Sequence, residues 1–382
     1  MKLLKVAVVM WMIGLGAVTA SAEEKPAQQL DTIVFVNGDQ LTGVLVRGVG
    51  NSVIFKSDMA GEITVPLAKI KELRSSGSFA VLRKDTQVHR GDLHLGTVSV
   101  TNGNVVLLSP IGAPEVIPVK EVGYILDQPT IDREVERKAG FLYGWSGTVS
   151  GGATIVQSTQ YGRTFHVGVS LARTVPTVAY LRARNRTLVD LQETYGKLTT
   201  PAIPPLDQNG NPKPDSVVKT SIFHTALERD QYFTKRFYAL GTMAFDHNYA
   251  QGLELQTLYG GGVGWTPIST PKQQLDVKAD LHYTKEEFQD PFSNQNLFAS
   301  SIAETYKLTL PRKMLLTQAL SILPAWNNLD AYAANGNVTF AMPVFKRLAM
   351  SVSAADSFLN NPSFGYKKNS FQLVTGITYS LK

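Results

Sequence analysis

One stretch of the chain, residues 253–283, holds two runs in which apolar and polar residues alternate with a period of two. In the second run the odd positions are apolar, and the even positions are Asp276, Lys278, Asp280 and His282. A period of two places alternate side chains on opposite faces of an extended strand. The stretch therefore predicts a β-hairpin with one apolar and one ionisable face. In a soluble sandwich the apolar face would form the core, whereas in an outer-membrane barrel it would meet lipid.

The first 22 residues have the parts of a secretory signal peptide. Lys2 and Lys5 precede an apolar run over residues 6–18, and the small residues Ala20-Ser21-Ala22 follow it. We expect cleavage after Ala22 and export of the mature chain. A membrane anchor is less favoured, because the apolar run is shorter than the roughly 20 residues that a spanning helix needs.

Composition narrows the classes of protein further. The sequence has no cysteine, so neither a disulfide nor a thiol ligand is available. Outside the signal peptide no stretch is apolar enough for a transmembrane helix, so a membrane protein of this sequence would have to be a closed barrel. The net charge of +6 is modest and no long basic run concentrates it, which argues against a nucleic-acid partner.

Residues 31–127 contain an internal repeat whose copies are offset by 53 residues. The turn signals Gly38-Asp39, Gly43 and Gly50-Asn51 recur as Gly91-Asp92, Gly96 and Gly103-Asn104, each followed by a short apolar strand. The pattern predicts two small β-modules, residues 31–75 and 76–127, after a linker over residues 23–30. Modules of this size are marginal alone, so we expect the copies to pack on each other or to share a sheet.

A charged segment over residues 128–139 marks a linker, and alternating runs then continue through residues 140–382. We count about twelve runs, near residues 141–157, 162–174, 184–199, 217–230, 235–248, 252–266, 272–286, 295–310, 313–325, 329–342, 346–357 and 368–381. An open sheet of this length would expose edge strands, whereas closure removes them. The sequence therefore predicts an all-β fold, an antiparallel transmembrane barrel of about 12 strands preceded by the two modules.

The connections between runs alternate in length. Residues 201–215, 286–296 and 360–368 form long connections at one end, and residues 311–312 and 343–347 form short ones at the other. Outer-membrane barrels have long extracellular loops and short periplasmic turns. This asymmetry favours a membrane barrel over a soluble sandwich.

The ionisable face of the hairpin must then line the lumen, because a Lys at the bilayer midplane costs about 2–4 kcal/mol. We predict these lumen-facing residues: Glu254, Gln256, Asp276, Lys278, Asp280 and His282. We predict these lipid-facing residues: Leu253, Leu255, Leu275, Val277, Leu281, Phe371, Leu373 and Ile377. Val277→Arg should then impair assembly, whereas Lys278→Ala should be tolerated. Mixed charges and about twelve strands predict a narrow or plugged interior.

Three glycine and aromatic motifs suggest a family. Residues 144–152 (GWSGTVSGG), 260–265 (GGGVGW) and 377–381 (ITYSL) resemble the salt-induced outer-membrane protein family of YdiY-like bacterial barrels. The resemblance implies a location in the cell outer membrane with the modules in the periplasm, and it carries over no catalytic residues. The partners that follow are outer-membrane lipid and the barrel-assembly machinery, which would read Tyr379 in place of a terminal aromatic residue.

Motifs for chemistry are missing from the sequence. The four histidines of the barrel region, His166, His224, His247 and His282, have no metal-ligand spacing, and no Gly-x-Ser-x-Gly elbow occurs. We therefore predict no catalytic residues, no metal, no cofactor and no enzymatic activity. The leading hypothesis is a structural barrel or a narrow channel for small solutes. The alternative is an envelope-anchored module that binds a peptide, glycan or protein partner, and a barrel lipid hydrolase is a third, less favoured hypothesis.

Overall fold

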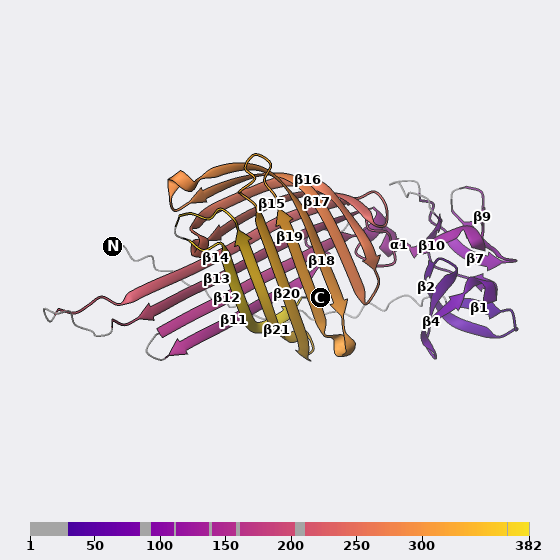
Figure 1. The fold of residues 1–382 in the computed structure, drawn as a ribbon. Helices are drawn as coiled ribbons and strands as arrows, with labels where there is room; N and C mark the ends of the chain where they lie inside the picture. Colours follow the sequence, from indigo (N-terminus) through magenta and orange to yellow (C-terminus); the bar gives the residue numbers. More distant parts are fainter. Residues whose placement is uncertain are drawn as a thin grey trace, which may run out of the picture. The chain divides into compact units, whose positions relative to one another are not determined.

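The computed structural model describes residues 30–84, 93–110, 112–136, 140–157, 161–202, 211–364 and 366–381. The chain divides into two compact units, Met1–Ile131 and Asp132–Lys382 (Figure 1). The predicted signal peptide lies outside the described residues, as do residues 23–29 of the first linker and the turn Gly91-Asp92. Among the described residues, no helix is long and apolar enough to cross a membrane.

The first unit consists of ten short strands with two single-turn 3₁₀ helices and a short helical end. The strands are β1 (Asp31–Phe35), β2 (Gln40–Val49), β3 (Ser52–Ser57), β4 (Gly61–Pro66), β5 (Ile70–Arg74), β6 (Phe79–Arg83), β7 (Thr97–Thr101), β8 (Asn104–Leu108), β9 (Glu115–Pro118) and β10 (Val122–Asp127). The helical segments are η1 (Leu67–Lys69), η2 (Val119–Glu121), α1 (Gln128–Thr130) and the π-helical η3 (Ile131–Val135), whose last residues belong to the second unit.

Strand pairing in this unit crosses between the two repeat copies. Within each copy the first and last strands pair, β1 with β5 and β6 with β10. In addition, β5 of the first copy pairs with β7 of the second, and β10 of the second pairs with β2 of the first. All ten strands therefore belong to one continuous sheet, in which the last strand of each copy pairs both with the first strand of its own copy and with the second strand of the other.

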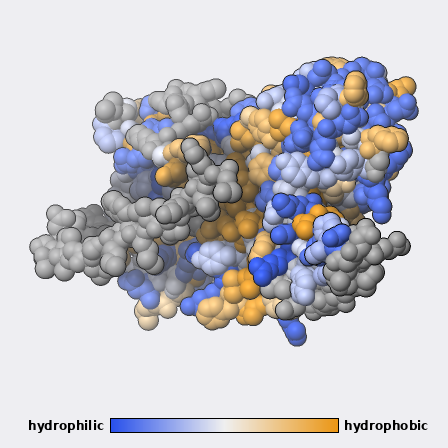
Figure 2. All heavy atoms as spheres, turned by 90° about the vertical axis from the view of Figure 1, so that its left-hand side faces the viewer, coloured by the Kyte–Doolittle hydropathy of each residue, from blue (hydrophilic) through white to orange (hydrophobic). Residues whose placement is uncertain are grey.

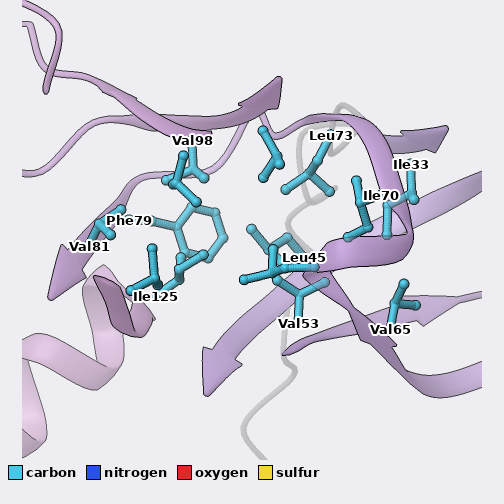
Figure 3. Packing of buried hydrophobic residues seen from close by; sticks show 14 of the residues in the cluster. Ile33, Leu45, Val53, Val65, Ile70, Leu73, Phe79, Val81, Val98 and Ile125 are labelled. Carbon is cyan, nitrogen blue, oxygen red and sulfur yellow. The ribbon is translucent and has the colours of Figure 1, made fainter. Parts of the chain in front are cut away.

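One apolar core serves both copies. Side chains from the first copy, among them Ile33 and Leu73, pack in the same cluster as Val98 and Ile125 from the second (Figure 3). Equivalent glycines also make the same close approach. A Cβ on Gly43 would lie 2.2 Å from the carbonyl oxygen of Lys56, and a Cβ on Gly96 would lie 2.2 Å from that of Leu108. Any larger residue would push apart the two strands that cross there.

The second unit is a closed barrel of twelve strands. They are β11 (Trp145–Gln157), β12 (Tyr161–Val175), β13 (Asn185–Thr200), β14 (Ser216–Tyr232), β15 (Phe237–Asn248), β16 (Leu253–Ser269), β17 (Gln273–Phe288), β18 (Gln295–Thr309), β19 (Leu315–Leu323), β20 (Ala333–Phe345), β21 (Leu348–Leu359) and β22 (Asn369–Ser380). Three single-turn 3₁₀ helices connect them: η4 (Tyr249–Gln251), η5 (Pro291–Ser293) and η6 (Pro311–Lys313).

Every barrel strand pairs antiparallel with the next, and β11 pairs with β22 to close the barrel. The strands run side by side and tilted in Figure 1. The predicted fold, an all-β chain with a closed antiparallel barrel of about 12 strands, is confirmed. The boundaries agree to within a few residues, even for the irregular runs β13, β14 and β19.

The connections differ from the predicted ones at two places. Strand β17 continues to Phe288, so the connection to β18 is shorter than predicted. Strand β20 continues to Phe345, and the tight turn to β21 places Lys346 at φ 41°. The β13–β14 hairpin is the longest: residues 216–221 of β14 extend beyond the last residue of β15 that pairs with them, and Figure 1 shows the two strands projecting past β15.

Candidate functional site

The barrel interior gathers the ionisable side chains of the second unit. On β17 the even-numbered residues Asp276 and His282 are buried, whereas the odd-numbered Leu281 and Tyr283 are exposed. Arg186 on β13 contacts Asp276 on β17, although β14, β15 and β16 lie between these strands. Side chains of strands that are not neighbours can meet only inside a closed barrel. The even-numbered face of β17 therefore points inward.

Arg186 is the centre of the largest interior cluster. Its Nε donates to Asp230 Oδ2 at 2.6 Å, and its Nη1 donates to Asp276 Oδ2 at 3.1 Å. Its Nη2 donates to the Tyr238 hydroxyl at 3.3 Å, and its guanidinium lies 5.2 Å from the centroid of that ring. The Asp230 side chain has no exposed surface, and that of Arg186 is 10% exposed. One cation thus holds two buried carboxylates from strands β14 and β17.

The second carboxylate of this cluster has further donors. The hydroxyl of Thr266 donates to Asp276 Oδ1, and the amide of Gln274 donates to Asp276 Oδ2 at 2.8 Å. By contrast, Asp230 Oδ1 is buried and has no hydrogen-bond partner among the described residues. Asp230 therefore depends on Arg186 far more than Asp276 does.

A second ion pair crosses the interior beside the first. Lys278 Nζ on β17 donates to both carboxylate oxygens of Glu228 on β14, at 2.6 and 2.8 Å. Both side chains are about 15% exposed. A carboxylate and an ammonium removed from water together retain their charges only while paired.

Hydrogen-bonded groups continue along β17 toward its far end. His282 Nδ1 lies 2.6 Å from Asp280 Oδ1, and the Ser301 hydroxyl donates to the other oxygen of Asp280. Further on, the buried carboxylate of Glu286 accepts from the amides of Gln256 and Gln295, each at 2.7 Å. Apart from Asp230 Oδ1, the carboxylates described in this half of the interior are thus hydrogen-bonded to other interior side chains.

Carboxylates outnumber cations among these inward-facing side chains. Within the described parts of β13 to β17, seven inward-facing acids accompany two inward-facing Arg or Lys residues. The acids are Asp190, Glu228, Asp230, Asp246, Asp276, Asp280 and Glu286, and the cations are Arg186 and Lys278, with His224 and His282 counted as neutral. The charged half of the interior therefore carries a negative formal charge.

A stripe of inward-facing glycines on β16 makes room for this cluster. A Cβ on Gly264 would lie 2.1 Å from Cζ of Tyr238, and a Cβ on Gly260 would lie 2.6 Å from Cβ of His282. Tyr238 is 1% exposed and cannot move aside without disturbing Arg186. The glycine-rich run thus supplies space for bulky side chains on β15 and β17.

The opposite wall, from β20 through β22 to β11, is lined by small neutral side chains. Their inward-facing hydroxyl and amide groups bond to each other: Thr339 with Ser353 at 2.6 Å, and Thr378 with Ser351 at 2.9 Å. No inward-facing acid or base occurs on the described parts of β20, β21, β22 and β11. The interior therefore has a bulky charged half and a small neutral half.

The end of the barrel that carries the long connections is closed by contacts across it. Gln251, in η4 between β15 and β16, is 2% exposed. Its amide donates to the carbonyl oxygens of Ser357 (3.1 Å) and Lys368 (2.7 Å), which flank the β21–β22 connection. Beneath it Leu253 and Phe288 pack with Leu359 of β21. Opposite walls therefore meet at this end.

Most of the predicted interior residues lie in this arrangement. Gln256, Asp276, Lys278, Asp280 and His282 all contribute hydrogen bonds to the interior. On the outer face, Leu255, Leu281, Phe371, Leu373 and Ile377 are exposed, and Leu275 and Val277 are half-buried there.

The predictions for Leu253 and Glu254 were wrong. Leu253, predicted to face lipid, is 5% exposed and packs inside, and Glu254, predicted to face the lumen, is exposed. The register shifts between Leu253 and Leu255, because a β-bulge places one extra residue on β16. A bulge reverses the alternation for every residue beyond it.

Sequence reasoning missed Arg186, the most connected residue of the interior. The signal was present, because Arg186 shares its parity with Asp190, Gln192 and Thr194 in one run. Within the described residues, no group of three or more His, Asp or Glu side chains could hold a metal ion.

No curated protein matches this chain. The translocator domain of the autotransporter NalP from Neisseria meningitidis is similar at 10% identity, over 65% of this chain and 93% of that one, with a TM-score of 0.30. A bacterial polysaccharide outer membrane secretin is similar at 9% identity, over 62% and 97%, with a TM-score of 0.30. A Pseudomonas aeruginosa FadL homologue is similar at 10% identity, over 92% and 85%, with a TM-score of 0.22.

A family model matches residues 185–381, which is just over half of the chain and extends from β13 to the end of the barrel. The matched segment contains Arg186, both of its carboxylate partners, the glycine stripe and the Lys278–Glu228 pair. The predicted family resemblance is thereby confirmed at this level, and the finer YdiY-like assignment stays a prediction. The chain belongs to the family described as DUF481, protein of unknown function.

Proposed function

We propose that the protein is an outer-membrane β-barrel of the cell envelope whose interior offers a narrow path for small polar solutes. The location is supported mainly by where the apolar and charged side chains of the barrel lie: apolar side chains face outward and charged ones face inward. Outward-facing Val263, Ile302 and Leu373 are each more than 60% exposed, whereas Asp230 inside is fully buried. In water such an exterior would be unfavourable, because each large apolar side chain gains about 1.5–3 kcal/mol on leaving water. Figure 2 shows hydrophobic patches on the surface beside hydrophilic ones.

Aromatic side chains at both strand ends support the same location. Phe237 and Trp265 stack at one end of β15 and β16, with ring centroids 5.9 Å apart. His247 and Tyr249 stack at the other end of β15, with centroids 4.9 Å apart. Such pairs at both ends of an apolar exterior match the aromatic girdles of membrane barrels.

The division of the interior into a bulky charged half and a small neutral half supports the proposed solute path. The Arg186 and Lys278 pairs fill the half formed by β13 to β17, so a solute would pass along the small hydroxyl-lined wall of β20 to β22. Carboxylates exceed cations in the facing half, which favours neutral or cationic solutes over anions. The contacts of Gln251 would limit entry from the outer end.

Three measurements test the proposed location. Mature protein fractionated from cells should be recovered with the outer membrane, and its electrophoretic mobility should change on heating, as expected for a folded barrel. Protease added to intact cells should leave the periplasmic strands β1 to β10 uncut. Recovery of the protein in the soluble fraction with heat-insensitive mobility would exclude the location.

Conductance tests the path separately. In planar bilayers we expect small, cation-preferring conductance from the full mature chain, increased by Gln251→Ala. If the protein inserts stably but shows no conductance, with and without this substitution, the proposed path is wrong and the barrel is purely structural.

One observation favours a second function, capture of an envelope ligand by the first unit. A hollow of about 620 Å³ lies between the two copies, lined by Leu45, Phe79, Asp127 and Pro129 among others. We propose that it binds a peptide, glycan or protein partner in the cell envelope. Titration of the full chain with soluble muropeptides, which carry both glycan and peptide groups, should perturb residues of this hollow, and an absence of binding would remove cell-wall fragments as the ligand.

A further inference from the structure

Three cations lie side by side on the outer face of the barrel. Arg163 on β12 is directly opposite Lys197 on β13, which is directly opposite Lys219 on β14. All three are exposed, and they share the parity of the exposed residues Phe165 and Tyr195. Residues directly opposite in an antiparallel sheet have Cα atoms about 4.5–5.5 Å apart. The cationic row therefore spans about 10 Å.

Among the residues that the structure describes, no carboxylate pairs with the cationic row. None of its members has an ion pair with a described residue. The acids nearest in sequence to Lys197 and Lys219 are Glu193 on β13 and Asp215 just before β14, each four residues away. Glu193 is bonded instead to the Ser221 hydroxyl at 2.9 Å. Elsewhere on the exterior Lys285 is paired with Glu287 at 2.6 Å. Like charges directly opposite in a sheet repel and are destabilising. A bound anion from outside the chain would reduce this repulsion.

The position of the row along the strands indicates which anion. Phe165 and Tyr195 are one pair of residues closer to the middle of the barrel, next to exposed Val167. Two residues advance about 7 Å along a strand. The polar zone on each side of the hydrocarbon is about 5–7 Å deep. With the aromatic pair at the interface, the cationic row lies at the level of lipid headgroups.

The row also lies on one side of the membrane only. It is next to the long β13–β14 connection, at the end opposite to the one where the chain enters β11 from the first unit. With the first unit in the periplasm, this end faces the outer leaflet. The anionic, phosphorylated lipid of that leaflet in Gram-negative bacteria is lipopolysaccharide.

We infer that Arg163, Lys197 and Lys219 form a binding site for the phosphate groups of lipopolysaccharide on the outer wall of the barrel. The inference rests on the proposed outer-membrane location. The β13–β14 wall, which projects beyond β15, carries the site, and the site lies apart from the interior path.

The test uses the full mature chain refolded in zwitterionic detergent, titrated with purified lipopolysaccharide. Each Lys or Arg near an anionic surface contributes about a fivefold gain in affinity. Changing all three residues to Gln should therefore weaken binding by about 100-fold. The matched control changes three exposed cations at the opposite end, Lys235, Arg236 and Lys272, to Gln and should bind as the wild type does.

The outcomes separate this inference from the proposed location. Heat-modifiable mobility of each variant shows that the barrel is folded. If the wild type does not bind, or if the row variant binds as tightly as the control, the inference is wrong while the location stands. If the wild-type protein is absent from the outer membrane of cells, the location itself is wrong, whatever the titration gives.

Discussion

Replacing Arg186 with Met tests whether the interior cluster stabilises the barrel. Met keeps most of the volume of the side chain and removes the charge and all donors. Asp230 then loses the donor to its Oδ2, while its Oδ1 already has no partner among the described residues. Asp276 keeps the donors of Thr266 and Gln274. The substitution thus leaves one buried carboxylate bare and a second one partly satisfied.

The expected loss is about 3–5 kcal/mol, the cost of removing one partner from a buried ion pair. This range corresponds to a decrease in the folding equilibrium constant of about 10² to 10³·⁵. Most of the loss should come from Asp230. Adding Asp230→Asn to Arg186→Met removes that bare charge, and we expect it to recover at least half of the loss. Adding Asp276→Asn instead should recover less.

The assay is equilibrium unfolding of the refolded barrel in urea, followed by heat-modifiable mobility and tryptophan fluorescence. The free energy of unfolding is compared at an unchanged denaturant slope, since a changed slope would mean that a different amount of surface is exposed. A loss below about 1 kcal/mol for Arg186→Met would refute the reasoning, because a buried pair cannot be broken so cheaply. Equal recovery by the two Asn substitutions would refute the assigned roles of the two carboxylates.

Three further predictions concern the wall, the glycine stripe and the outer end. Val277→Arg should reduce assembly into membranes, by about 2–4 kcal/mol if the residue lies near the midplane. Lys278→Ala should also destabilise the barrel in urea, because it leaves its carboxylate partner unpaired. An unchanged free energy of unfolding for Lys278→Ala would argue against that ion pair. Gly264→Ala should destabilise the barrel by about 1–3 kcal/mol. Gly241→Ala is the control and should not destabilise it, because a Cβ at Gly241 would meet nothing within 4 Å. Equal melting temperatures for the two variants would contradict the packing argument. Gln251→Ala should increase conductance in planar bilayers without lowering stability by more than about 1.5 kcal/mol, and an unchanged current would show that the outer contacts do not limit entry.

The barrel could be predicted from sequence because its information is local. Alternation over nine to seventeen residues defines each strand, and strands that are consecutive in the sequence are neighbours in the barrel. The inward side of β17 followed from the cost of placing Lys278 in lipid. The sequence also predicted that Lys278→Ala would be tolerated. That prediction did not take into account the carboxylate partner that a buried lysine needs, and the structure leads us to expect destabilisation instead.

What could not be predicted depends on contacts between distant residues or on single irregular positions. A bulge at Glu254 leaves no mark in the alternation, so the orientation of Leu253 was assigned wrongly. The Arg186 cluster joins β13, β14 and β17, and periodicity gives the face of each residue but not its partner across the lumen. The pairing of β5 with β7 and of β10 with β2 likewise leaves no trace in the local pattern.

This pairing between the copies has a consequence for how the first unit arose and how it behaves when divided. The last strand of each copy also pairs with the second strand of the other, so separating the copies would leave both of these strand edges unpaired. Two such copies on separate chains would pair their edges with each other across a two-fold axis, as the subunits of a symmetric homodimer do. The repeat has the form of a symmetric dimer joined into one polypeptide, and cutting it between β5 and β6 should give fragments that reassociate in pairs.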